Sequence, residues 1–219
     1  MRDAENIRAV SELDINLMGF IFWQKSPRFV KMISSQTGIM PDYSHLKIQG
    51  NKGPKRQEIK RVGVFVDDMP QNIVTRVYNY QLDYVQLHGN ESRVMIENLR
   101  RTLDPDIRKG IQIIKAISIE SAVDIAKCEE YEGVVDLFLF DTKTPLVGGS
   151  GNQFDWSVLE GYKGQTPFLL SGGIGPDDVE RVKSFRHPMF VGIDLNSKFE
   201  TEPAVKDVRG AKRNVEERE

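Results

Sequence analysis

The chain alternates between short apolar runs and longer segments whose apolar residues recur every three or four positions. The runs are short enough for strands, and the segments between them are long enough for helices. The runs lie near residues 17, 62, 84, 112, 137, 168 and 190. Seven strands, each followed by a helix-sized segment, predict a parallel sheet, either open or closed as a (βα)8 TIM barrel.

One apolar run, Leu137–Phe140, ends abruptly at the carboxylate of Asp141. Its residues are apolar on both faces, which is typical of a parallel strand covered on both sides. A polar, glycine-rich loop follows, and α/β proteins place their chemistry at the carboxyl ends of such strands. Asp141 is therefore the leading catalytic candidate, and the alternative is that it only caps a turn.

Capping residues indicate where several helices begin. Asp3 is placed to cap a helix from about Ala4 to Leu13, and Pro70 is placed to open another that continues to about Tyr78. A further helix is expected over about Glu120 to Glu129.

Composition narrows the class of protein. The 219 residues are 39% hydrophobic and 28% charged, with a formal net charge of -2. We therefore expect one soluble domain over residues 1–219, without affinity for nucleic acid. No apolar run approaches the roughly 20 residues that cross a bilayer, so a cytoplasmic protein is expected. A single cysteine, Cys128, excludes an internal disulfide and is expected to be a structural or surface thiol.

The segment at about residues 41–60 differs from the rest because it is rich in Lys and Arg and has no apolar period. It predicts an exposed basic loop. Binding of nucleic acid is a weaker interpretation, because aromatic residues for base stacking are nearly absent.

Other candidate site residues lie at or near the carboxyl ends of the remaining predicted strands. They are Lys25, Arg28, Asp67, Asp68, His88, Lys115, Ser171, Gly172, Gly173, Asp194, Asn196 and Ser197. A glycine turn that opens a helix favours an anion, and phosphate sites recur after the last two strands of such barrels. We therefore expect Gly172 and Gly173 to bind one phosphate together with Asn196 and Ser197, although the glycines could serve only a tight turn.

Neither a cofactor nor a metal is indicated. No strand leads into a G-x-G-x-x-G fingerprint, and the sequence has no Walker loop. His45, His88 and His187 are scattered without the spacing of metal ligands.

Taken together, these motifs resemble the phosphoribosylanthranilate isomerases, which are (βα)8 enzymes of tryptophan biosynthesis. The resemblance covers most of the chain. It rests on GFIFWQKSPRFV, RVGVFVDD, VQLHGNE, FDTKTPLVGGSGNQFDW, LLSGGIGPDDV and GIDLNSKFE, in that order. It implies a cofactor-free Amadori rearrangement of a small phosphosugar substrate by a monomer or homodimer.

The resemblance also implies roles for individual residues. Asp141 matches the general acid that protonates the furanose ring oxygen, and Arg28 matches the arginine that meets the anthranilate carboxylate. The SGG turn at 171–173 and the LNS turn at 195–197 match the phosphate site. His88 and Asp194 match substrate-binding positions at the rim of the site.

The chain departs from the family at its beginning. Family members start with a strand that ends in K-x-C-G, whose cysteine is the general base, and the first residues of this chain resemble the family's segment directly after that motif. The first barrel strand and its cysteine are absent, and Cys128 does not replace the cysteine by pattern. We expect the true start to lie upstream of Met1, and the alternative is an incomplete barrel with impaired activity.

Two other functions stay open. A phosphate turn without the base would suit a non-catalytic phosphate-binding barrel. A related phosphosugar enzyme of histidine or tryptophan biosynthesis is a further alternative, although Arg28 within KSPRF argues against it.

Overall fold

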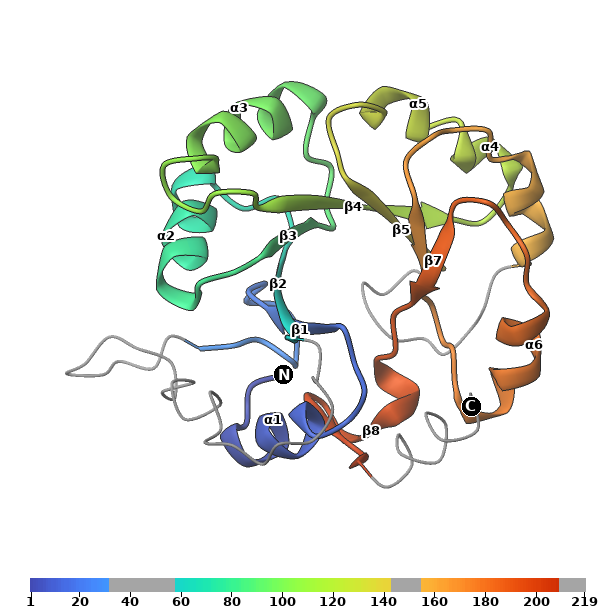
Figure 1. The fold of residues 1–219 in the computed structure, drawn as a ribbon, viewed down its shortest axis with the longest axis horizontal. Helices are drawn as coiled ribbons and strands as arrows, with labels where there is room; N and C mark the ends of the chain where they lie inside the picture. The colour runs from blue at the N-terminus through green and yellow to red at the C-terminus, as the bar shows by residue number, and fades with distance from the viewer. Residues whose placement is uncertain (32–57, 143–154, 209–219) are drawn as a thin grey trace.

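The computed structural model describes residues 1–31, 58–142 and 155–208. Its centre is the predicted seven-stranded parallel sheet, and the order of the strands in the sheet is their order in the chain. The strands are β1 (Leu17–Ile21), β2 (Lys60–Phe65), β3 (Tyr84–Leu87), β4 (Gln112–Ile119), β5 (Leu137–Thr142), β6 (Phe168–Leu170) and β7 (Phe190–Ile193). The sheet curls around its own interior (Figure 1). This is a TIM-like half-barrel.

Helices surround the curled sheet (Figure 1). They are α1 (Ala4–Ser11), α2 (Pro70–Tyr80), α3 (Arg93–Leu103), α4 (Ala122–Ile125), α5 (Cys128–Tyr131) and α6 (Val179–Ser184). Short 3-10 helices are η2 (Trp156–Gly161), η3 (Pro176–Asp178) and η4 (Ser197–Phe199).

Two of the predicted helix starts are confirmed, and one predicted helix is wrong in form. The side chain of Asp3 accepts a hydrogen bond from the backbone of Asn6, and Pro70 is the first residue of α2. The single helix expected over about 120–129 is instead the pair α4 and α5. The backbone between them tightens into i→i−3 hydrogen bonds, such as that from Lys127 N to Asp124 O.

Side chains of β5 alternate between two apolar layers, as expected for a strand covered on both sides. Phe138 and Phe140 are fully buried in the layer between the sheet and the helices. Leu137 and Leu139 point the other way, into a cluster inside the curl with Val62, Ile114 and Ala116. Burying each large apolar side chain contributes about 1.5–3 kcal/mol. The same alternation directs the next odd residue, Asp141, toward the interior.

The sheet ends at β1 and β7, which do not pair with each other among the described residues. Two backbone carbonyl groups on the free edge of β1 nevertheless accept hydrogen bonds. The Met1 amine donates to Gly19 O at 2.7 Å, and Val30 N donates to Ile21 O at 2.8 Å. The described part is therefore a curled sheet that is open between β1 and β7, and the eighth strand stays a prediction.

A small antiparallel hairpin, β8 (Glu200–Glu202) and β9 (Val205–Lys206), lies beside α1 near this opening (Figure 1). Asn6 joins the two elements, because its Nδ2 donates to Lys206 O at 2.9 Å and its Oδ1 accepts from Lys206 N at 2.8 Å. The hairpin is thereby fixed to the beginning of the chain.

Several predictions fall outside the described residues. Most of the basic loop at about 41–60 lies in residues 32–57, and only its last residues are described, with Lys60 already in β2. The glycine-rich loop after β5 also lies outside. None of the helices in the described ranges is long and apolar enough to span a membrane.

Candidate active site

Two predicted site residues meet at the carboxyl ends of the strands. Asp141 near the end of β5 and His88 just after β3 approach each other, with His88 Nε2 3.3 Å from Asp141 Oδ2. Each side chain is 21% exposed, so both are open to a small ligand yet partly shielded from water. The arrangement pairs a carboxylate with an imidazole in one partly enclosed place.

A residue that sequence reasoning missed sets the orientation of His88. Gln86 precedes it by two positions and therefore faces the same way, and its Nε2 lies 3.1 Å from His88 Nδ1. With the Gln86 amide nitrogen as donor, Nδ1 accepts and Nε2 carries the proton that faces Asp141. The period-two spacing of Gln and His within VQLHG could have revealed this pair.

Asp194 lies close to the same site, directly after β7. Ser171 Oγ donates to Asp194 Oδ2 at 2.9 Å, and the backbone N–H of Asp194 donates to Leu170 O at 2.7 Å. Burial raises the pKa of Asp194, and the charge of Asp141 adds to that effect, whereas the Ser171 hydrogen bond opposes it. The structure thus brings Asp194 into the electrostatic neighbourhood of Asp141.

The predicted glycine turn has the conformation that its sequence suggested. Gly172 and Gly173 adopt φ values of +88° and +69°, which favour glycine. A Cβ on Gly172 would meet the Thr142 hydroxyl and lie 2.7 Å from the Thr142 backbone N. The turn therefore packs directly against the end of β5, next to Asp141.

The second predicted anion-binding turn lies beside the first. Ser197 is the first residue of η4 and Asn196 directly precedes it. A Cβ on Gly175 would lie 3.3 Å from Cβ of Lys198 in the same 3-10 helix. The segments that contain Gly172 and Asn196 are thus neighbours at the carboxyl ends of β6 and β7.

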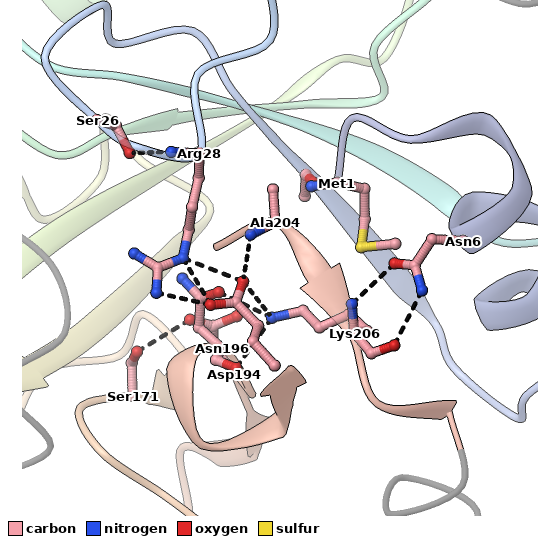
Figure 2. A network of polar contacts seen from close by, with 11 residues as sticks. Met1, Asn6, Ser26, Arg28, Ser171, Asp194, Asn196, Ala204 and Lys206 are labelled. Atoms are coloured by element: carbon pink, nitrogen blue, oxygen red, sulfur yellow. Dashed lines mark hydrogen bonds and ion pairs between the residues drawn. The ribbon is translucent and has the colours of Figure 1, made fainter. Parts of the chain in front are cut away.

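Arg28 is paired with a carboxylate that the sequence prediction did not include, Glu200. Arg28 Nε donates to both carboxylate oxygens at 3.0 and 2.8 Å, and Nη2 donates to Oε2 at 2.6 Å. Lys206 Nζ lies 3.3 Å from Glu200 Oε1 and donates to Asn196 Oδ1 at 2.8 Å. Figure 2 shows the side chains of Arg28 and Lys206 directed toward the same place, beside Asn196 and Asp194.

Glu200 is nearly buried, with 4% of its side chain exposed. Burial by itself raises the pKa of Glu200, but the hydrogen bonds from Arg28 and the charge of Lys206 outweigh it, so the pKa lies below its usual value. Arg28 and Glu200 are far apart in the chain, and no local pattern indicates their pairing.

Lys115 does not belong with these residues, although it was a candidate by position. It faces the helical side of the sheet, where its side chain and that of Glu91 are each 2% exposed and form an ion pair at 3.1 Å. Lys115 Nζ also donates to Gly89 O at 2.7 Å. The ion pair therefore holds the loop after β3 from the helical side of the sheet. Lys115 does not face the interior of the curl.

The other strand-end candidates stabilise loops or face solvent. Asp67 Oδ1 accepts from Asn90 N at 2.6 Å, and Asp68 Oδ1 accepts from Met69 N at 2.8 Å at the start of α2. Lys25 is exposed.

Cys128 is a structural thiol and not a surface one. It begins α5 with 2% of its surface exposed, and burial raises its pKa to about 12. A thiol with so high a pKa is not a base near neutral pH. No group of three or more His, Cys, Asp or Glu side chains that could hold a metal ion occurs in the described ranges.

The half-barrel, with an acid and an imidazole at the carboxyl ends of its strands beside two glycine-containing turns, is characteristic of TIM-barrel enzymes. Comparison with known proteins gives the family. The sequence profile described as N-(5'phosphoribosyl)anthranilate (PRA) isomerase matches residues 1–217. The chain therefore belongs to this family of isomerases.

Individual relatives support this family assignment. The chain is 44% identical over 217 residues to the N-(5'-phosphoribosyl)anthranilate isomerase of Parabacteroides distasonis, covering 99% of this chain and 90% of the relative. The crystal structure of phosphoribosyl anthranilate isomerase from Thermotoga maritima has a TM-score of 0.73 at 28% identity, covering 99% and 96% of the two chains.

A further solved structure has a TM-score of 0.71 at 24% identity and covers 99% and 93% of the two chains. It is a phosphoribosyl anthranilate isomerase in complex with reduced 1-(o-carboxyphenylamino)-1-deoxyribulose 5-phosphate.

Proposed function

We propose that this chain performs the cofactor-free Amadori rearrangement of N-(5-phosphoribosyl)anthranilate to 1-(2-carboxyphenylamino)-1-deoxy-D-ribulose 5-phosphate in tryptophan biosynthesis, in the cytoplasm. The observation that carries the proposal is the pairing of Asp141 with His88 next to the Gly172 turn. A proton donor beside an anion-binding turn suits a substrate whose reacting ring lies close to a phosphate.

Asp141 is the proposed general acid. It gives a proton to the furanose ring oxygen, the bond from that oxygen to the first sugar carbon breaks, and the nitrogen lone pair forms a Schiff base. Loss of a proton from the second carbon then gives an enol, which becomes the ketone of the product. Asp194 and His88 line the same site and contact the sugar in this proposal.

The two ends of the substrate carry negative charge, and the proposal assigns a group to each. The backbone of Gly172 and Gly173, with Asn196 and Ser197, binds the phosphate. Arg28 binds the anthranilate carboxylate, for which a planar guanidinium is well suited. The compound bound in the related structure has both a carboxylate and a phosphate.

The proton on the second carbon needs a base, and the family resemblance assigns that role to a cysteine in K-x-C-G. The 219 residues contain no such motif, and buried Cys128 is unsuited to the role. The neighbouring turns at Gly172 and Asn196 would by themselves also suit a second candidate function, a non-catalytic phosphate-binding barrel.

Turnover of phosphoribosylanthranilate separates the two candidates. The assay compares the 219-residue chain with a version extended at Met1 by a strand that ends in K-x-C-G. We expect the extended version to turn over substrate and the shorter one to be about 10²- to 10⁴-fold slower, as for loss of a general base. An extended version that binds phosphate but converts no substrate would favour the scaffold. A panel of other phosphosugars as substrates tests whether the chain is instead one of the related barrel enzymes.

The version of the chain that converts phosphoribosylanthranilate is called the active form below.

A further inference from the structure

The guanidinium of Arg28 has one edge occupied and another available. Glu200 takes the Nε–Nη2 edge through contacts of 2.6 to 3.0 Å. Nη1 has no hydrogen-bond partner among the described residues, and it points away from the carboxylate in Figure 2. A planar guanidinium can accept a second carboxylate on its Nη1–Nη2 edge while the first stays in place.

We propose that Glu200 is a positioning residue, which fixes the Arg28 guanidinium so that its free edge receives the carboxylate of the aromatic part of the substrate. The inference rests on the proposed function, since it assumes that Arg28 meets that carboxylate. Glu200 itself does not touch the substrate.

Glu200 is held firmly enough for this role. Its Oε1 accepts from Ala204 N at 3.2 Å within the β8–β9 hairpin, and Lys206 Nζ lies 3.3 Å from the same oxygen. The hairpin is in turn fixed to α1 through Asn6. On the other side, the backbone N–H of Arg28 donates to Ser26 Oγ at 3.1 Å. Both partners are thus fixed before a ligand binds, which lowers the entropy lost on binding.

The charges around Arg28 also allow it to bind a second anion. The carboxylate of Glu200 is shared between Arg28 and Lys206, so one negative charge faces two cations. A further acid near Lys206 is Asp194, whose pKa is raised by burial. An incoming carboxylate would meet a cation that Glu200 orients without fully neutralising it.

A purely structural ion pair would behave differently from a positioning pair. It would support the hairpin and the segment that contains Arg28, and its loss would weaken the binding of every ligand to a similar degree. A positioning residue affects ligands that carry the carboxylate far more than ligands that lack it.

The test measures binding to the 219-residue chain by calorimetry, so that it does not depend on turnover. The probes are reduced 1-(o-carboxyphenylamino)-1-deoxyribulose 5-phosphate and the same compound without the carboxylate. We expect Glu200→Gln to weaken binding of the first probe about tenfold or more and to leave the second within about twofold. Arg28→Lys should give the same pattern, and adding Glu200→Gln to it should cause little further loss.

A ligand-free measurement keeps the proposal testable on its own. In ¹⁵N NMR spectra, the Nε–H proton of Arg28 should exchange slowly with water in the wild type and rapidly in Glu200→Gln. The backbone amide signals should keep their chemical shifts. An unchanged Nε–H signal in the variant would overturn the proposed positioning.

The outcomes also separate this inference from the proposed function. A wild type that binds both probes equally would show that Arg28 does not meet the carboxylate, which contradicts the proposed function and overturns the inference with it. A wild type that prefers the carboxylate, with the preference kept in Glu200→Gln, would overturn the role of Glu200 alone.

Discussion

Nε2 of His88 and Oδ2 of Asp141 are 3.3 Å apart although their strands, β3 and β5, are separated by β4. Neighbouring strands lie about 4.8 Å apart, so the two side chains must lean toward each other across β4. The β4 residues that face the same way near its carboxyl end, Ala116 and Ser118, are small, and Ser118 is in register with Asp141. Small side chains on the middle strand, together with the curl of the sheet, allow this contact.

The contact predicts that His88 supports the action of Asp141. His88→Asn should lower kcat of the active form about 10- to 100-fold, since a hydrogen bond to a charged group contributes roughly 1.5–3 kcal/mol. Steady-state kinetics of the isomerisation measure the change. Gln86→Ala, which removes only the group that orients the imidazole, should lower kcat less. An unchanged kcat in His88→Asn would show that the contact has no part in the reaction.

Gly172 should tolerate no side chain. Gly172→Ala places a Cβ against Thr142 at a φ of +88°, so we expect a loss of stability of about 1–3 kcal/mol and weaker binding of inorganic phosphate. Denaturant unfolding and phosphate titration provide the measurements. Gly161→Ala is the matched control, because the nearest atom to its Cβ is 4.0 Å away. Equal effects of the two substitutions would argue against a special conformation at Gly172.

The buried pair of Lys115 and Glu91 should be important for stability but not for the chemistry. Lys115→Met leaves the Glu91 carboxylate buried without its cation, which should cost about 3–5 kcal/mol. Combining it with Glu91→Gln should recover part of that loss. Chemical denaturation of both single variants and the double variant tests this. A Lys115→Met variant of normal stability would contradict the structural role.

Asp194 should make stability depend on pH. Burial raises its pKa, so the folded state holds the proton more tightly than the unfolded chain does. The resulting stabilisation is complete below the unfolded pKa of about 3.9 and is lost as the pH rises through the folded value. Asp194→Asn, which stays neutral, should therefore become more stable relative to the wild type as the pH rises from about 4 to 7.

Urea denaturation at several pH values measures this difference. Ser171→Ala removes a hydrogen bond that lowers the pKa of Asp194, so its stability should fall more with rising pH than that of the wild type. A difference between Asp194→Asn and the wild type that is the same at every pH would contradict the prediction.

Local signals in the sequence were enough to predict much of the fold. The Asp3 cap, the Pro70 helix start and the seven apolar runs each depend on residues close together in the chain, and the structure confirms them. Alternation along a strand likewise directs Asp141 inward from Leu139, because it depends only on neighbouring residues.

The rest depends on contacts between distant segments, which local patterns do not encode. Position in the carboxyl-terminal half of a predicted strand made Lys115 a candidate, but the alternation of β4 directs its side chain to the helical side, where it pairs with Glu91. Glu200 lies within a motif used for the resemblance, yet only the folded chain brings it to Arg28. The helical pattern around Cys128 did not reveal whether its thiol faces solvent or the core.

Asp141→Asn in the active form tests the central claim most directly, with kcat and the affinity for reduced 1-(o-carboxyphenylamino)-1-deoxyribulose 5-phosphate measured on the same preparation. Loss of the general acid should lower kcat by at least about 10²-fold while the affinity changes only a few-fold. A variant that isomerises phosphoribosylanthranilate at nearly the wild-type rate would contradict the account.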